Sequence, residues 1–204
     1  MNILKKIYRT TLNIFGDIKV FPWPMFILYH PEGYGVKGED VRKVISKAQA
    51  GDILVRGYKR YLDGYFIPGF FSHAGLVVQD GMVIHAMADG VFKEDLINFC
   101  RCDFMAILRF KKNKVTDIDK YQACAKAEEM IGVGYDFEFE SGDDEYYCTE
   151  MVYEAWRPFL KIKPMIIKAL GGLIKKESIT PDQLWDHSDL DVVFSTEQVS
   201  DNFS

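Results

Sequence analysis

Three residues of this chain carry side chains suited to covalent catalysis: His73, His85 and Cys148. The chain has four histidines, and two of them fall in the short stretch FSHAGLVVQDGMVIHA, residues 71–86. An imidazole changes its charge near neutral pH and can therefore act as a base, an acid or a metal ligand. A cysteine thiolate is a strong nucleophile, so a thiol beside an imidazole would support acyl transfer through a thioester.

Whether the two histidines meet depends on the register of the hairpin that carries them. A three-residue loop over residues 79–81 predicts a type I turn followed by a left-handed glycine, Gly81. This loop pairs Val78 with Met82, Gly75 with His85 and His73 with Met87. His73 and His85 then lie on one face of the sheet as diagonal neighbours, with their backbones about 7 Å apart. Gly75, opposite His85, leaves room for a ring.

A two-residue loop at Asp80 and Gly81 would instead place the two histidines on opposite faces. Only the three-residue loop gives one consistent apolar face, made of Ala74, Leu76, Val78, Met82, Ile84 and Ala86. The second face then holds His73, Gly75, Val77, Val83, His85 and Met87. The pair alone is also compatible with a hydrogen-bonded structural role, so the argument for catalysis needs a third group.

Cys148 is the candidate for that third group. It stands at or within a residue of the start of a predicted helix over residues 148–159. The apolar stripe of this helix consists of Cys148, Met151, Val152, Ala155, Trp156 and Phe159. A helix N-terminus and a neighbouring imidazole both lower the pKa of a thiol, and the terminus offers a backbone N–H to an oxyanion. The other cysteines are interpreted as small buried hydrophobes: Cys100, Cys102 and Cys124.

The elements that must position these residues follow the order helix, strand cluster, helices. Periodicity and capping predict helices over residues 39–48, 116–131 and 148–159 and a short one within 178–185. Strands are expected at residues 52–57, 90–94 and 104–110 beside the histidine hairpin, with a helical turn at 94–100. This order favours an α+β fold with an antiparallel sheet. The acidic run 136–145 is interpreted as a solvated loop.

Composition limits the classes of partner. The net charge of -5 over 204 residues offers no basic surface for nucleic acid. No apolar run of about 18 residues predicts a membrane-spanning helix, and no signal-peptide cleavage site follows the N-terminal region. We therefore expect a cytoplasmic protein with reduced cysteines. An amphipathic helix over residues 3–15 is expected to pack on the body, with contact to a membrane surface as the alternative.

The segments GDILVRG, FFSHAGLVV, VIHA, YDFEF, YYCTEMVYEAW and ITPDQL, in this order, resemble the permuted papain-like branch of the NlpC/P60 superfamily, specifically its YiiX/YaeF-like group. The resemblance covers about residues 50–187, and the order histidine, second polar residue, cysteine is distinctive. It implies an α+β, circularly permuted papain-like fold with a small antiparallel sheet or partial barrel packed against helices. Residues 1–49 would be an N-terminal extension packed on the body, and residues 50–204 the catalytic domain.

The resemblance also implies a role for each candidate residue. Cys148 would be the nucleophile, His73 the general base and His85 the third residue that orients the base. The third position in this group is often acidic, so a histidine there leaves the substrate open. The backbone N–H of Cys148 would contribute to an oxyanion hole, with Tyr147 as a weaker donor. The aromatic segment 58–71 either covers a core edge or lines a pocket, and Tyr65 and Phe71 are its candidate substrate contacts.

Three functions are compatible with these residues. The first is a cysteine peptidase or amidase that cleaves an amide bond, for example in a cell-wall-like peptide, without a cofactor. The second is a lipid thioesterase or acyltransferase of the same fold, suggested by the aromatic segment 58–71 and the apolar segment 165–174. The third is a binding module in which His73, His85 and Cys148 hold zinc. The expected substrate is a small peptide or another acyl or amide compound. No role is assigned to His30 or His187.

Overall fold

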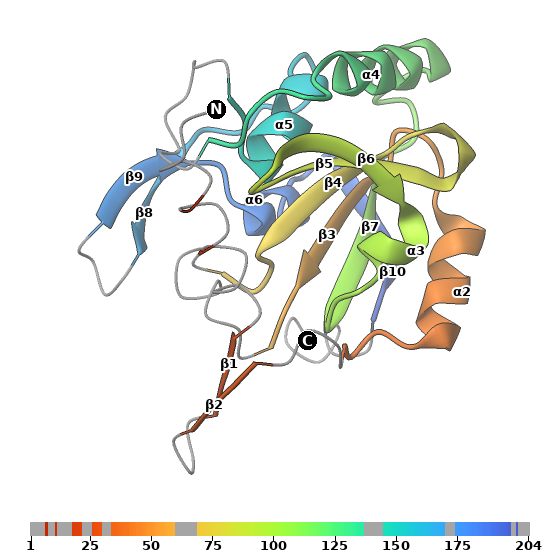
Figure 1. Ribbon diagram of the computed structural model, residues 1–204. Helices are drawn as coiled ribbons and strands as arrows, with labels where there is room; N and C mark the ends of the chain where they lie inside the picture. The colour runs from red at the N-terminus through yellow and green to blue at the C-terminus, as the bar shows by residue number, and fades with distance from the viewer. Residues whose placement is uncertain are drawn as a thin grey trace.

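A six-stranded antiparallel sheet forms the centre of the computed structural model (Figure 1). The structure describes residues 34–59, 69–136, 145–169 and 174–196, together with Ile7, Thr11, Val199 and the segments 18–21 and 26–29. The sheet order is β10-β7-β3-β4-β5-β6. Its strands are β3 (Ile53–Gly57), β4 (His73–Val77), β5 (Met82–Met87), β6 (Gly90–Asp95), β7 (Phe104–Phe110) and β10 (Leu190–Ser195). The expected α+β fold with an antiparallel sheet is thus confirmed.

Helices cover both faces of this sheet (Figure 1). The described helices are α2 (Gly38–Lys47), α3 (Leu96–Phe99), α4 (Asp117–Glu129), α5 (Cys148–Ala155) and α6 (Pro181–Trp185). Helices α4, α5 and α6 contribute to the hydrophobic cluster on one face, and α2 and α3 to the cluster on the other. Two separate hairpins complete the description: β1 (Ile18–Phe21) with β2 (Phe26–Tyr29), and β8 (Met165–Ala169) with β9 (Ile174–Ser178).

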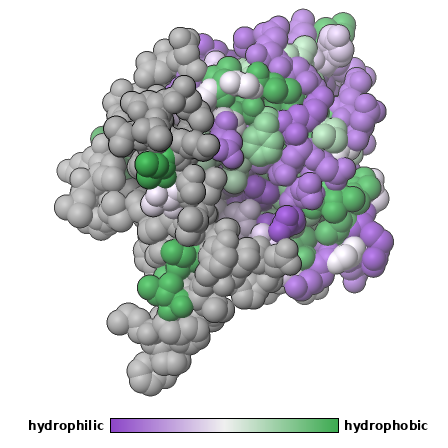
Figure 2. Space-filling model, in the orientation of Figure 1, coloured by the Kyte–Doolittle hydropathy of each residue, from purple (hydrophilic) through white to green (hydrophobic). Residues whose placement is uncertain are grey.

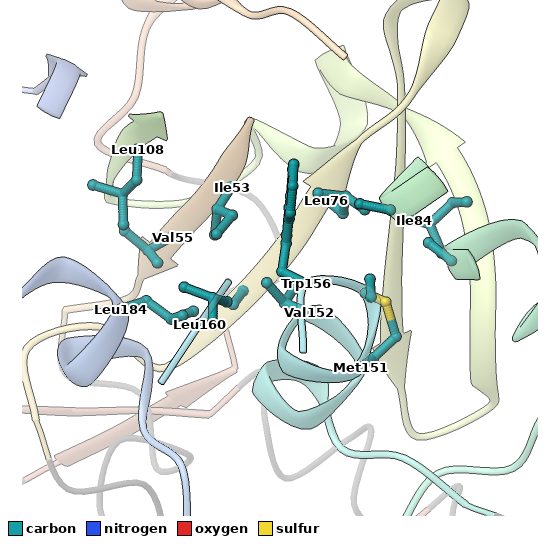
Figure 3. Close-up of a cluster of buried hydrophobic side chains, with 14 of the residues drawn as sticks. Ile53, Val55, Leu76, Ile84, Leu108, Met151, Val152, Trp156, Leu160 and Leu184 are labelled. Carbon is teal, nitrogen blue, oxygen red and sulfur yellow. The ribbon is translucent and has the colours of Figure 1, made fainter. Parts of the chain in front are cut away.

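The larger cluster fills the space between the sheet and α5. Met151, Val152 and Trp156 project from the α5 region toward the side chains of the sheet (Figure 3). The facing sheet residues alternate along their strands, as side chains of a pleated strand must, and include Ile53, Val55, Leu76 and Ile84. The residues between them, such as Leu54, Val77 and Val83, face the second cluster. The central strands are therefore buried on both faces, which fixes their register firmly.

The histidine hairpin has the register that the sequence predicts. Val77 pairs with Val83 and Leu76 with Ile84, and the N–H of Val78 donates to the carbonyl of Met82 at 2.8 Å. The loop spans Gln79–Gly81, so it has three residues. The expected type I turn is wrong, because Asp80 has a φ of 62° and Gly81 a φ of 69°. Aspartate tolerates this left-handed region better than most residues, so the loop places two residues there instead of glycine alone.

Helices α4 and α6 begin where capping chemistry predicts. Thr116 and Asp119 form a capping box at α4, and Thr180 and Gln183 form another at α6, where Pro181 follows the cap. Helix α5 starts at Cys148 but ends at Ala155, before the predicted end at residue 159. Pro158 explains the early end, because proline lacks an N–H and disfavours helical geometry in the residue before it.

Two features differ from the sequence interpretation. Strand β10 was not expected; it pairs with β7 at the edge of the sheet through a bulge between Val192 and Phe194. The apolar segment after residue 164 forms the β8–β9 hairpin. Most of the predicted helix 3–15 lies outside the described residues, although Ile7 and Thr11 are described and helical. Most of the aromatic segment 58–71 and most of the acidic run 136–145 lie outside them as well.

Among the described residues before residue 50, helix α2 packs on the sheet. Val44 is fully buried in the second cluster, which also contains Val36. The boundary between an N-terminal extension and a catalytic domain at residue 50 stays a prediction. None of the helices in the described ranges combines the length and the apolar character that crossing a bilayer requires. Over the described part of the surface in Figure 2, hydrophobic patches alternate with hydrophilic side chains.

Candidate active site

His73 and His85 are in direct contact. Nε2 of His73 lies 2.8 Å from Nδ1 of His85, and the two rings meet edge-on at an interplanar angle of 81°. Both side chains are buried, with 7% and 1% of their surface exposed. A β-carbon at Gly75 would lie 2.8 Å from Val83 Cγ1 and 3.2 Å from His85 Cβ. The absence of a side chain at Gly75 therefore leaves the space that Val83, Phe99 and the base of the His85 side chain occupy.

Aromatic rings hold the imidazole pair in place. The ring centroid of Phe99, from α3, lies 5.7 Å from that of His73 and 5.3 Å from that of His85. Phe92, which pairs with His85 across β5 and β6, lies 4.5 Å from the His85 ring. Packing of this kind restricts the rotamers of both histidines and so preserves their mutual geometry.

Cys148 is the first residue of α5, and only 3% of it is exposed. Its thiol receives a hydrogen bond from the backbone N–H of Ala74, the residue that follows His73, and another from the N–H of Thr149. The Thr149 hydroxyl lies 3.7 Å from the sulfur. The fold thus brings the thiol to the start of β4, beside the strand position of the histidine. Within the described part of the chain, no hydrogen bond joins the thiol to either imidazole.

The protonation states of Cys148 and His73 at rest differ from those expected from the sequence. Burial raises the pKa of the Cys148 thiol, although the hydrogen bonds from Ala74 and Thr149 and the charge of Arg56 oppose the rise. Burial also lowers the pKa of His73 well below its usual value, with further contributions from Arg56 and His85. The predicted lowering of the thiol pKa is therefore wrong, because desolvation outweighs the favourable hydrogen bonds. At neutral pH the shifts of both pKa values favour a neutral thiol at Cys148 and a neutral imidazole at His73.

Two charged residues that the sequence interpretation missed extend the histidine pair. Nε2 of His85 lies 3.0 Å from Oε1 of Glu94, although the contact is too bent for a linear hydrogen bond. Arg56 is 4% exposed, and its Nη1 lies 4.0 Å from the same Glu94 oxygen. The arginine also donates to the Phe99 carbonyl at 2.7 Å and stacks over the Phe99 ring at 4.1 Å.

A signal for both residues was present in the sequence. Glu94 stands two positions after Phe92, the residue opposite His85, so the alternation of β6 places it on the histidine face. Arg56 lies directly opposite His73 across β3 and β4. Neither residue could be assigned to the site from the sequence alone, because Glu94 depends on the pairing of β6 with β5 and Arg56 on the pairing of β3 with β4.

The three weaker candidates have different surroundings. The Tyr147 side chain is 2% exposed, and its hydroxyl accepts the N–H of Ile179 at 2.9 Å. The Phe71 ring is fully buried in the core. Its centroid lies 5.3 Å from that of the Trp185 ring and 5.9 Å from that of the Phe104 ring. Tyr65 lies outside the described residues. Contact of these residues with substrate or oxyanion stays a prediction.

The zinc alternative does not fit the geometry of the histidine pair. Nε2 of His73 and Nδ1 of His85 point at one another across 2.8 Å, and this is the separation of a hydrogen bond. Two nitrogens bound to one zinc would each lie about 2.0–2.1 Å from the ion and would be directed at it. Among the described residues, no group of three His, Cys, Asp or Glu side chains is arranged to hold a metal.

Comparison with known proteins relates this chain to others by fold and by family. No curated protein matches the sequence. Among solved structures, the crystal structure of metalloprotein yiiX from Escherichia coli O157:H7 superposes with a TM-score of 0.61 at 18% identity. The match covers 74% of this chain and 98% of that one, and it shows a shared fold.

The family comparison is more specific. The model of the YaeF/YiiX family of permuted papain-like amidase enzymes, designated C92, matches residues 47–200. The match includes the histidine hairpin, Glu94 and Cys148, and it agrees with the resemblance seen in the sequence. The chain therefore belongs to the C92 family of permuted papain-like amidases.

Proposed function

We propose that the protein hydrolyses an amide bond in a peptide-like substrate, with Cys148 as nucleophile, His73 as general base and His85 as the residue that orients the base. The observation that carries this proposal is the 2.8 Å contact between two buried imidazoles at the start of β4, where the Cys148 thiol receives the N–H of Ala74. Membership of an amidase family supports the reaction class.

The raised pKa of the thiol decides how the nucleophile would be activated. Since Cys148 rests as a thiol, His73 must take its proton while the sulfur attacks the substrate carbonyl. Nε2 of His73 is held by His85, so Nδ1 is the nitrogen left for this proton. The proton then passes to the departing amine as the C–N bond breaks and a thioester forms. Water, deprotonated by His73, hydrolyses the thioester and restores the thiol.

The start of α5 is suited to stabilise the negative charge that develops on the carbonyl oxygen. The first N–H groups of a helix have no partner within the helix, and the helix dipole is positive at this end. The N–H of Cys148 is the donor nearest the attacking sulfur along the chain. We assign it to the oxyanion hole.

The experiment is hydrolysis of a panel of short peptide amides, including cell-wall-type peptides, by the wild type and by Cys148→Ala. The matched control is Cys124→Ala, which removes another buried thiol, one that points to the Val77 carbonyl. We expect loss of activity in the first variant and retention in the second. Hydrolysis that persists in Cys148→Ala would overturn the nucleophile assignment.

A second candidate, acyl transfer from a lipid, is favoured by one observation. Met165 and Ile166 on the β8–β9 hairpin are 47% and 61% exposed, and exposed apolar side chains suit contact with a lipid surface. Mass spectrometry of the protein after incubation with phospholipid vesicles tests it. An acyl adduct on Cys148 would favour lipid chemistry, and its absence together with peptide hydrolysis would exclude it.

A further inference from the structure

Polar side chains form a continuous chain of contacts from Glu94 in β6, through His85 in β5, to His73 in β4. Oε1 of Glu94 lies 3.0 Å from Nε2 of His85, and Nδ1 of His85 lies 2.8 Å from Nε2 of His73. The three side chains come from the adjacent strands β6, β5 and β4. The chain ends at the residue that precedes Ala74, whose N–H meets the Cys148 thiol.

We propose that Glu94 is a positioning residue that fixes the proton of His85 on Nε2, thereby fixes the proton of His73 on Nε2, and so leaves Nδ1 of His73 free to act as the base. The part of this inference that concerns catalysis rests on the proposed amidase function; the part that concerns proton positions does not.

The proposal follows from counting donors and acceptors. An ionised carboxylate can only accept, and a neutral imidazole carries one N–H and one lone pair. A lone pair on Nε2 of His85 would face a carboxylate oxygen at 3.0 Å and be repelled by it, so this nitrogen carries the hydrogen and the lone pair lies on Nδ1. The 2.8 Å contact between the rings then requires the hydrogen on Nε2 of His73. The lone pair of His73 is left on Nδ1, the nitrogen that His85 does not occupy.

The charges around this chain support the same protonation states. Burial acts to raise the pKa of Glu94, but the contact with His85 and the charges of His85, Arg56 and Arg101 outweigh it, so the net shift is downward. Burial, together with Arg56, lowers the pKa of His73 and of His85 although Glu94 opposes this at His85. An ionised carboxylate beside two neutral imidazoles is the arrangement that the proton count requires.

Arg56 places a fixed positive charge near the carboxylate. Its guanidinium is held by the Phe99 carbonyl at 2.7 Å and by the Phe99 ring at 4.1 Å, and it lies 4.0 Å from Glu94. The arginine disfavours a second positive charge nearby, so the histidine pair stays neutral at rest. During attack, when His73 becomes an imidazolium, Glu94 offsets the new charge through His85. The carboxylate thus acts one residue further from the base than it would in a triad with an acidic third member.

The experiment is ¹⁵N NMR of the full chain with labelled histidine, which separates protonated from unprotonated ring nitrogens without a substrate. The chain has only four histidines, and His73→Gln and His85→Gln assign the two signals of interest. We expect wild-type His73 and His85 to carry hydrogen on Nε2 and none on Nδ1. A wild-type spectrum with hydrogen on Nδ1 of His73 would overturn the proposal, whatever the variants do.

Variants of Glu94 test the cause. In Glu94→Ala and Glu94→Gln we expect a second population with hydrogen on Nδ1 of both histidines, because the alanine offers no acceptor and the glutamine amide can donate as well as accept. The control Glu129→Gln, on a side chain 69% exposed in α4, should give the wild-type spectrum. Unchanged histidine signals in a folded Glu94→Ala protein would overturn the proposal.

The two proposals fail in different ways. If the protein hydrolyses no amide but the histidine hydrogens lie as expected and shift in the Glu94 variants, the amidase function fails and the role of Glu94 in setting protons stands. If hydrolysis depends on Cys148 but Glu94→Gln leaves kcat and its pH profile unchanged, the positioning role fails. We expect kcat to fall in Glu94→Gln with little change in KM, because the effect is on the base and not on substrate binding.

Discussion

Nε2 of His73 and Nδ1 of His85 lie 2.8 Å apart, and both histidines are almost completely buried. This contact commits one nitrogen of each ring to the other ring. A histidine pair committed in this way orients a base well, because the position of each proton depends on its neighbour.

Removal of the second ring should impair the chemical step. We expect His85→Ala to lower kcat by about 10²–10⁴-fold, the range typical for loss of effective general-base catalysis. KM should change little. Steady-state kinetics on a cleaved peptide amide measure this, with His187→Ala as the control outside the pair. Equal kcat in His85→Ala and the wild type would remove His85 from the site.

Gly75 should not tolerate a side chain. A β-carbon there would meet Val83 Cγ1 at 2.8 Å and Phe99 Cε2 at 2.9 Å, so Gly75→Ala should lose about 1–3 kcal/mol of unfolding free energy and displace the His85 ring. Urea denaturation and activity assays measure both effects. The matched control is Gly38→Ala, where the nearest atom outside the local chain is Arg42 Nη1 at 3.7 Å. Full stability and activity in Gly75→Ala would contradict the packing.

Stability should decline in mild acid because of the histidine pair. The pKa values of His73 and His85 are lowered in the folded state, so the unfolded chain binds protons first as the pH falls below about 6.5. Their contribution to stability is complete above that pH and is lost on acidification. Unfolding free energy measured against pH should fall less steeply in a double His73→Gln, His85→Gln variant. The same slope in both proteins would show that the pair does not titrate in this way.

The Cys148 thiol should react slowly with iodoacetamide at neutral pH. Its pKa is raised by burial, so a thiolate is scarce until the pH becomes alkaline. The alkylation rate, followed by peptide mass spectrometry, should rise with pH in a single alkaline step. A rapid rate that stays constant down to about pH 5, below the usual pKa of histidine, would indicate a preformed thiolate–imidazolium pair instead.

Much of the site was predictable because short-range rules determine it. The alternation of apolar residues in FSHAGLVVQDGMVIHA fixes the register, and this register places His73 and His85 on one face of the sheet, where their rings meet. The helix after Tyr147 was similarly clear from its apolar stripe.

The remainder depends on contacts between distant segments. Glu94 joins the pair only because β6 lies beside β5, and Arg56 only because β3 lies beside β4. The direction of the thiol pKa shift was wrong because helix-end and hydrogen-bond effects can be read from the chain, whereas complete desolvation of Cys148 requires the packed structure. The left-handed conformation of Asp80 is likewise a feature of the folded loop that its composition did not reveal.

The central claim is that Cys148 forms a covalent acyl intermediate with help from His73. Intact-protein and peptide mass spectrometry after rapid quenching with a slowly hydrolysed ester or amide substrate tests it most directly. We predict an acyl adduct on the peptide that contains Cys148, no adduct in Cys148→Ala, and a strongly slowed appearance of adduct in His73→Ala. Turnover of the same substrate without an adduct, or with an adduct on another cysteine, would contradict the account.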